Sequence, residues 1–318
     1  MGRLTINTMR VRNMKKPNTK IDFVSAILLL GLATAWGGSF FFAEVAMKEL
    51  PPLTVTLHRV FWAVPILFII IKFKRIILPN SFHVWCRYLV MGALNNAIPF
   101  SLIFWAQTNI GSGLAAILNS TTAVFGALVA GVLLVDEQLT IKKVLGALIA
   151  VVGVAVILGI NAIKDLNITN LSQIAVLCAA VSYSLASVWG KKYLSEYPPL
   201  VNAFGMLSGG TLIMVPIVLY IDGIPSLAIP AYVGMSLFSL VIISTVIAYL
   251  LFFEILRRAG AANLMLVTLL IPPIAVVLSS LFLDEKFENT AWIGFLIIAV
   301  GLLITDGRLI EKIKLKDQ

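Results

Sequence analysis

Apolar stretches, each about as long as a bilayer is thick, follow one another along almost the whole chain with short polar gaps between them. A helix needs about 20 mainly apolar residues to cross the hydrocarbon core, where backbone groups must find their hydrogen bonds within the segment. The pattern therefore predicts an all-α membrane protein with ten transmembrane helices. They are expected at Phe23–Met47, Leu53–Ile71, Trp85–Trp105, Leu114–Val135, Val144–Ile163, Leu171–Trp189, Leu200–Ile221, Ala231–Phe253, Asn263–Leu283 and Ala291–Thr305.

Basic residues are concentrated in every second gap between these stretches. Of the 24 Lys and Arg residues, 20 fall in the terminal segments and alternate gaps, counting Arg87 at the edge of the third span, three fall in the other gaps, and Arg59 alone lies deep within a span. Cytoplasmic loops of membrane proteins carry an excess of Lys and Arg. The distribution predicts a multi-pass protein of the plasma membrane, in bacteria the inner membrane, with both termini in the cytoplasm.

Composition excludes several other classes of protein. The 318 residues are 60% hydrophobic and 12% charged, with a mean hydropathy of +1.00, and a soluble domain cannot bury so much apolar surface. The net charge of +9 is explained by membrane orientation, so no nucleic-acid partner is expected. The sequence contains no phosphate-binding loop, metal-ligand spacing or catalytic dyad. We expect no enzyme activity, no cofactor and no metal.

The chain also contains an internal repeat. Leu134-Val135-Asp136-Glu137-Gln138-Leu139 is matched 148 positions later by Phe282-Leu283-Asp284-Glu285-Lys286-Phe287, and Gly146 and Gly153 are matched by Gly294 and Gly301. Each copy holds five predicted spans, an odd number, so the second copy should enter the membrane in the opposite orientation. The expected organisation is a basic segment at 1–21, repeats at 22–163 and 164–306, and a tail at 307–318.

Inverted repeats are an architecture of secondary transporters, whose substrate site lies near the membrane midplane between the two halves. The alternative is that duplication only provides a stable helix bundle. The repeat therefore favours transport without establishing it.

Several of these features together resemble a known family. The first span contains Trp36-Gly37-Gly38-Ser39-Phe40, each half contains Asp-Glu followed by a span with Gly-x6-Gly, and the ninth span contains Pro272. The fourth span reads Ala115-Ala116-Ile117-Leu118-Asn119-Ser120-Thr121-Thr122-Ala123. In this order the features resemble the EamA type of the drug/metabolite transporter superfamily.

The resemblance implies a transporter of amino acids or other small metabolites. We expect secondary transport of an amino-acid-like solute, export rather than import, and alternating access around a central pocket. A proton or another ion would supply the energy, and the protein would be a monomer or a homodimer. The alternatives are a flippase for lipids or lipid intermediates and a membrane sensor without transport activity.

Glu44 and Arg59 flank the Pro51-Pro52 turn almost symmetrically, each about 10 Å into its span by helical rise. Isolated charges at such depth are costly, so the two side chains are predicted to pair. The pair would be either a fixed structural contact or an outer gate and polar contact for the substrate.

Two other ionisable residues are candidates for proton coupling. His58 can titrate near neutral pH, although its neighbour Arg59 points about 100° away on the helix. Glu254 lies at the cytoplasmic end of the eighth span and has Arg257 and Arg258 at salt-bridge spacing. For both residues a purely structural role is the alternative.

Aromatic and amide residues within the spans are the candidates for substrate binding. Trp36 and Tyr183 are repeat equivalents near the middle of their spans, too deep for an interfacial belt, and Tyr249 is also deep. Asn95 and Asn119 should face the bundle interior, where they either join helices or line a polar path. Pro272-Pro273 is expected to interrupt the ninth span, as a hinge or as a fixed kink.

Overall fold

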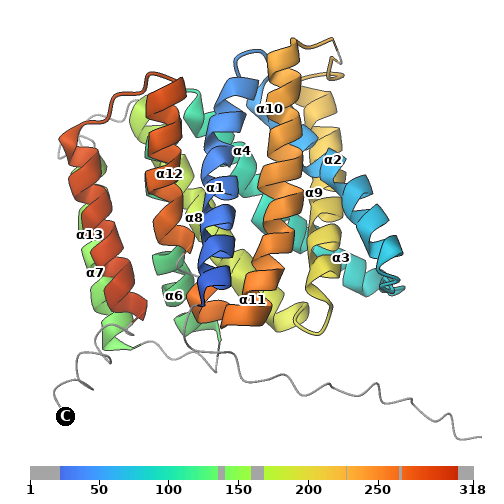
Figure 1. The fold of residues 1–318 in the computed structure, drawn as a ribbon, viewed down its shortest axis with the longest axis horizontal. Helices are drawn as coiled ribbons and strands as arrows, with labels where there is room; N and C mark the ends of the chain where they lie inside the picture. The colour runs from blue at the N-terminus through green and yellow to red at the C-terminus, as the bar shows by residue number, and fades with distance from the viewer. Residues whose placement is uncertain (1–21, 135–139, 159–167, 227, 265–266, 307–318) are drawn as a thin grey trace, which may run out of the picture.

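The computed structural model of the protein describes residues 22–134, 140–158, 168–226, 228–264 and 267–306. These residues form a helical bundle that contains no strand in the described part of the chain (Figure 1). Its elements are α1 (Phe23–Ala46), α2 (Pro52–Phe73), α3 (Phe82–Gly92), the π-helix η1 (Ala93–Ala97), α4 (Ile98–Gln107), α5 (Ser112–Asn119), α6 (Thr122–Leu133), α7 (Ile141–Leu158), α8 (Ile168–Tyr193), α9 (Pro199–Ile221), α10 (Ala231–Val241), the π-helix η3 (Ile242–Ile247), α11 (Ala248–Leu264), α12 (Val267–Phe282) and α13 (Asn289–Asp306).

Seven helical segments among the described residues are long and apolar enough to cross a membrane, which confirms the all-α membrane class. Three further apolar helices are shorter. The seven are Phe23–Ala46, Pro52–Phe73, Phe82–Gln107, Ser112–Leu133, Thr169–Tyr193, Pro199–Ile221 and Ala231–Phe252, and the shorter three are Val144–Gly153, Leu270–Phe282 and Asn289–Gly301.

Helices of each half of the chain pack against helices of the other half, and the contacts come in matching pairs. In sequence order α1 corresponds to α8, α2 to α9, α4 to α11, α6 to α12 and α7 to α13. Helix α1 packs on α12, and correspondingly α8 packs on α6; helix α4 packs on α8, and correspondingly α11 packs on α1. Two corresponding pairs, α7 with α13 and α2 with α9, pack directly on each other and lie toward opposite ends of the bundle's long axis (Figure 1).

Two spans contain a π-helical turn that their hydrophobic pattern does not reveal. In the first, η1 ends just before Pro99, whose ring nitrogen has no hydrogen to donate to the carbonyl of Asn95 four residues earlier. The second, η3, occupies the corresponding place in the other half without a proline. Such turns widen the helix and leave carbonyl groups available to neighbouring side chains.

The fourth predicted span is broken, although it lacks a proline. Helix α5 ends at Asn119 and α6 begins at Thr122. Successive hydroxyls donate to carbonyls three residues earlier, from Ser120 to Ile117, from Thr121 to Leu118 and from Thr122 to Asn119, at 2.6–2.7 Å. These local bonds compete with the helix ladder and explain the break. The polar patch is thus satisfied mainly within its own segment.

The ninth predicted span is a continuous helix where we expected an interruption. Helix α12 runs continuously from Val267 to Phe282 through both Pro272 and Pro273, so the expected interruption at the prolines is wrong. The predicted start at Asn263 is also wrong, since α11 extends to Leu264. The charged residues after Phe253 indicated the end of a span, but the helix continues beyond the apolar stretch. Whether the prolines act as a hinge stays a prediction.

Helices α3 and α9 approach each other through glycines. A methyl group on Gly92 would lie 2.3 Å from the backbone nitrogen of Gly210 and 2.6 Å from the carbonyl carbon of Gly209. Small residues allow this close approach, which is a main source of packing between membrane helices. The contact lies directly before η1 and so fixes the π-helical turn against α9.

Replacing Gly92 with alanine should therefore destabilise the fold. The added methyl group meets backbone atoms that cannot rotate away, and we expect a loss of about 1–3 kcal/mol, measured as a lower melting temperature of the purified protein in detergent. Gly126→Ala is the control, because a methyl group there would meet only Ser184 Oγ at 3.9 Å. Equal melting temperatures for the two variants would contradict the α3–α9 geometry.

Candidate functional site

Arg59 is the centre of the polar interior. Its side chain is only 6% exposed, and its Nε donates to Thr245 Oγ1 at 3.3 Å while Nη2 donates to the carbonyl of Ser244 at 3.4 Å. The guanidinium carbon lies 3.9 Å from the ring centroid of Phe100. A helix from the first half thus places its cation against the π-helical turn η3 of the second half.

Two of the predicted substrate-binding residues lie near this guanidinium, and a third is linked to one of them by a hydrogen bond. The hydroxyl groups of Tyr183 and Tyr249 lie within electrostatic range of Arg59, and Tyr249 shares a side-chain hydrogen bond with Asn95. The ring of Tyr183 meets the ring of Phe100 edge to face, with centroids 6.4 Å apart. The cluster therefore combines α2, η1, α4, α8 and α11.

The corresponding contact in the other half, between α9 and the π-helical turn η1, is made by different chemical groups. Asn96 of η1 donates from Nδ2 to the carbonyl of Met206 at 3.0 Å, and Asn95 Nδ2 lies 3.4 Å from the sulfur of Met206. Met206 is the repeat counterpart of Arg59. The same helix-to-π-turn contact is therefore made by an arginine in one half and by amides in the other.

Sequence reasoning missed Phe100, Ser244 and Thr245 as partners of Arg59. Ser244 and Thr245 had a weak signal, because they are hydroxyl residues inside a predicted span and Ser244 is the repeat counterpart of Asn96. Phe100 had none, since a phenylalanine in an apolar span is ordinary. The carbonyl of Ser244 lies in the π-helical turn η3, which the hydrophobic pattern does not reveal.

Glu44 does not pair with Arg59, so the predicted ion pair is wrong. Its carboxylate instead accepts a hydrogen bond at 3.2 Å from Nε2 of Gln107, which also donates to the carbonyl of Phe40 at 2.9 Å. Among the described helices, α1 and α2 diverge after their short connection and do not pack along their lengths. Equal depth on consecutive helices was therefore insufficient to bring the two charges together.

Trp36 and Asn119 occupy different surroundings. The ring of Trp36 lies 5.9 Å from that of Phe252, which is three residues after Tyr249 and so on the same side of α11. Trp36 therefore adjoins the Arg59 cluster. Asn119 is the last residue of α5, and its carbonyl accepts from Thr122. No contact in the described part of the chain joins Asn119 to Arg59.

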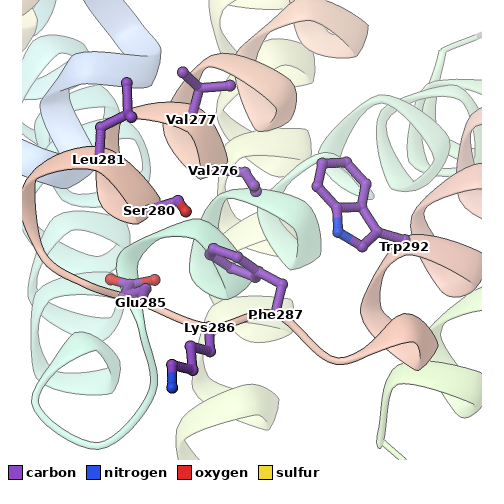
Figure 2. A pocket seen from close by; sticks show the side chains of 8 residues that line it. All are labelled: Val276, Val277, Ser280, Leu281, Glu285, Lys286, Phe287 and Trp292. Atoms are coloured by element: carbon purple, nitrogen blue, oxygen red, sulfur yellow. The ribbon is translucent and has the colours of Figure 1, made fainter.

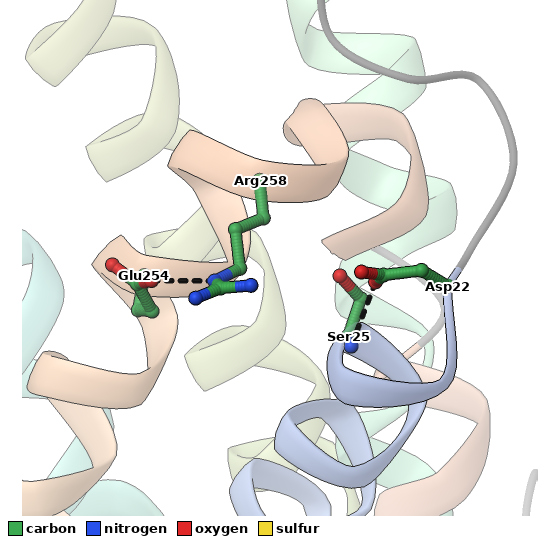
Figure 3. A network of polar contacts seen from close by, with 4 residues as sticks. All are labelled: Asp22, Ser25, Glu254 and Arg258. Carbon is green, nitrogen blue, oxygen red and sulfur yellow. Dashed lines mark hydrogen bonds and ion pairs between the residues drawn. The ribbon is translucent and has the colours of Figure 1, made fainter.

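The two coupling candidates also lie in different environments. His58 Nδ1 accepts a hydrogen bond from Trp62 Nε1 at 3.0 Å, while its buried Nε2 has no partner among the described residues. Glu254 forms an ion pair with Arg258, four residues along α11. Figure 3 shows Arg258 between Glu254 and Asp22, which caps α1 by accepting from the backbone nitrogen of Ser25. Hydrogen bonds from the side chain and the backbone of Ser25, aided by the charge of Arg258, lower the pKa of Asp22 below its ordinary value.

The second copy of the Asp-Glu motif has a structural role. The carboxylate of Glu285 accepts from the backbone nitrogen and hydroxyl of Ser112, at 2.8 and 2.9 Å, and from the backbone nitrogen of Gly113 at 3.3 Å. It therefore caps the N-terminus of α5, where a negative charge is favourable. The first copy, Asp136-Glu137, lies outside the described residues.

A separate cavity of about 540 Å³ lies at the end of α12 beside α13, and Arg59 is not among its lining residues (Figure 2). Val277 and Leu281 on its wall are 53% and 69% exposed. The cavity is therefore open and has an apolar wall on its α12 side. Its lining residues are Val276, Val277, Ser280, Leu281, Glu285, Lys286, Phe287 and Trp292, and none is a predicted substrate-binding residue.

The model of the EamA-like transporter family matches the chain twice, at residues 24–159 and 170–305. The chain therefore belongs to the EamA-like transporter family, as its motifs predicted, with the family's two-repeat architecture. This membership identifies it as a multi-pass membrane protein of a transporter family.

Curated relatives of similar length agree with this assignment. An uncharacterized transporter of Archaeoglobus fulgidus is 23% identical over 292 residues, covering 92% of this chain and 99% of the relative. A probable amino-acid metabolite efflux pump of Escherichia coli is 25% identical over 293 residues, covering 87% and 93%. A solved crystal structure shares the fold with a TM-score of 0.63 at 16% identity, covering 89% of this chain and 96% of that one.

Removing the Glu285 carboxylate should destabilise α5. Glu285→Ala leaves two backbone nitrogens and one hydroxyl without their acceptor, and we expect a loss of about 1–2 kcal/mol in thermal unfolding. Glu288→Ala is the matched control in the same loop, because Glu288 accepts a side-chain bond only from Thr290 two residues away. A similar loss in both variants would argue against the cap.

Proposed function

We propose that this protein is a secondary transporter that moves a small, amino-acid-like metabolite out of the cell across the plasma membrane, which in bacteria is the inner membrane. The observation that carries the proposal is the cluster around Arg59, where a buried cation, two tyrosines and an amide from both halves meet inside a membrane bundle. Charged residues inside membrane spans are costly and usually mark a substrate or ion path.

The proposed architecture is ten spans in two inverted repeats, at residues 22–163 and 164–306, with cytoplasmic segments at 1–21 and 307–318. Seven long apolar helices and three shorter ones supply the required number. The matching contacts support a twofold relation between the halves, and helix α1 begins at the same side of the bundle as helix α13 ends (Figure 1). Alternating access would rock one half against the other.

The pocket would be lined by Trp36, Asn95, Asn119, Tyr183 and Tyr249. Tyr183 and Tyr249 are only half-buried, although protein atoms surround both rings closely. We take their free surface to face a space within the bundle. Glu44 remains the proposed outer gate, through its contact with Gln107 rather than with Arg59.

Export of an amino-acid-like solute is favoured over the other cargoes by one relative, which is named a probable amino-acid metabolite efflux pump. A lipid flippase is less well supported, because no residue of the Arg59 cluster lines the open cavity at α12. A fluorescent phospholipid assay would decide between them, since a flippase scrambles labelled lipid whereas a metabolite transporter leaves it in place. A sensor without transport activity would give neither signal. The protein is proposed to act as a monomer or homodimer.

Counterflow in proteoliposomes tests both the function and the pocket. Vesicles loaded with an unlabelled amino-acid mixture should accumulate the same labelled amino acids, and Trp36→Ala should lower the rate about tenfold, which corresponds to about 1.4 kcal/mol of lost binding. Trp105→Ala is the control, since Trp105 is 38% exposed on α4. Absence of counterflow with every amino acid would remove amino acids as cargo, and equal loss in both variants would remove Trp36 from the pocket.

Proton coupling through His58 or Glu254 is a second part of the proposal. The unpartnered Nε2 of His58 favours it, whereas the ion pair with Arg258 occupies Glu254. If His58 couples proton flow to transport, His58→Gln should abolish accumulation driven by a pH gradient and leave counterflow intact, because counterflow needs no net driving force. Glu254→Gln is measured in parallel and identifies the other candidate. Full gradient-driven accumulation in both variants would exclude both residues.

A further inference from the structure

Arg59 retains hydrogen-bonding capacity that the protein does not use. A guanidinium has five N–H donors, and the described residues accept from Nε and Nη2 only, at the long distances of 3.3 and 3.4 Å. Nη1 donates to no residue in the described part of the chain, and the side chain is more than nine-tenths buried. The cation is thus held in position by weak contacts.

The carboxylates of the described residues are engaged elsewhere or distant from this cation. Five of them have partners that hold them toward the ends of helices or loops, and none makes an ion pair with Arg59. They are Glu44 with Gln107, Glu49 with Tyr232, Asp222 with Thr54, Glu254 with Arg258 and Glu285 with Ser112. The positive charge of Arg59 therefore has no compensating anion among the residues that the structure describes.

The groups around Arg59 compensate only part of this charge. The face of Phe100 at 3.9 Å provides a cation–π contact, and the Ser244 carbonyl and the Thr245 hydroxyl provide dipoles. Tyr183 and Tyr249 add neutral hydroxyls. A full negative charge would interact with the guanidinium much more strongly than these dipoles, because the surrounding medium has a low dielectric constant.

Resting on the transport function proposed above, we propose that Arg59 binds the carboxylate of the transported solute. The planar fork of a guanidinium matches the two oxygens of a carboxylate, and such bonds are shorter and stronger than bonds between neutral groups. The N–H groups of Arg59 that donate to no described residue would donate to the carboxylate oxygens of the solute. The hydroxyl of Tyr183 can donate to the same anion.

A panel of matched compounds tests whether the free carboxylate is required. The purified protein in detergent is titrated with each amino acid, the corresponding amino-acid amide, the corresponding 2-oxo acid and inorganic phosphate, and thermal stabilisation is measured. We expect one or more acids to bind, the 2-oxo acid to retain binding, and the amide to bind about 10- to 100-fold more weakly. Equal binding of acid and amide, binding of phosphate in place of the acids, or binding of no acid would overturn the proposal.

Variants then assign the requirement to Arg59. Arg59→Gln should abolish the discrimination between acid and amide, and Arg59→Lys should restore part of it because the charge is kept but the fork is lost. Arg87→Gln is the matched control, since Arg87 also donates to a backbone carbonyl, that of Tyr193, and lies over an aromatic ring, but does so on α3 away from the cluster. Unchanged discrimination in Arg59→Gln would overturn the assignment.

The two proposals fail in different ways. If an acid binds with the expected dependence on Arg59 but shows no counterflow, transport is wrong and the anion site stands. If counterflow occurs equally with acids and amides, transport stands and the carboxylate assignment is wrong. Folding of each variant is checked by its elution profile and by its melting temperature without ligand. Should Arg59→Gln not fold, the comparison of acid with amide on the unaltered protein still decides the proposal.

Discussion

The physical constraint on which this structure depends is the burial of a guanidinium within a membrane-spanning bundle. Such a charge is tolerated only where acceptors replace water, and an α-helix offers few because its carbonyls are already bonded to its own nitrogens. The π-helical turn η3 supplies two acceptors at this point, the carbonyl of Ser244 and the hydroxyl of Thr245. Thr245 extends the network, because its hydroxyl donates to the carbonyl of Leu240 while accepting from Arg59. In η1 the carbonyl of Leu94 is likewise taken by a neighbouring hydroxyl, that of Ser182.

The long apolar helices could be predicted from the sequence, because hydrophobic length alone decides which segments can enter lipid. The distribution of Lys and Arg is the basis of the proposed orientation, which stays a prediction. Helix irregularity could not be predicted in the same way. The break after Asn119 comes from three consecutive hydroxyl groups, whereas α12 continues through Pro272 and Pro273. We took proline as the sign of a helix break, and it indicated the ninth span instead of the fourth.

Contacts between residues distant in sequence were predictable only in kind. The cost of isolated charges correctly indicated that Glu44 and Arg59 each need a partner, but it could not identify the partner, because depth in the membrane does not fix the side of the helix on which a residue lies. Glu285 illustrates the same limit. Its motif located the repeat, yet its capping of α5 joins residues 173 positions apart and depends on how loop and helix meet in space. Trp36, Tyr183, Tyr249 and Asn95 were singled out because aromatic and amide residues are unusual in mid-span, and their role in binding stays a prediction.

The two halves combine a similar scaffold with different chemistry, and this difference has a consequence for recognition. At corresponding crossings, a helix meets a π-helical turn through the charge of Arg59 in one half and through the amide of Asn96 in the other. A fully symmetric site would bind a solute equally well in two opposed orientations. Because only one half supplies a cation at this contact, a solute with one charged end would have one favoured orientation in the proposed site. In the proposed mechanism the duplicated helices provide the two moving halves, and the difference between Arg59 and its counterpart Met206 provides the polarity of the site between them.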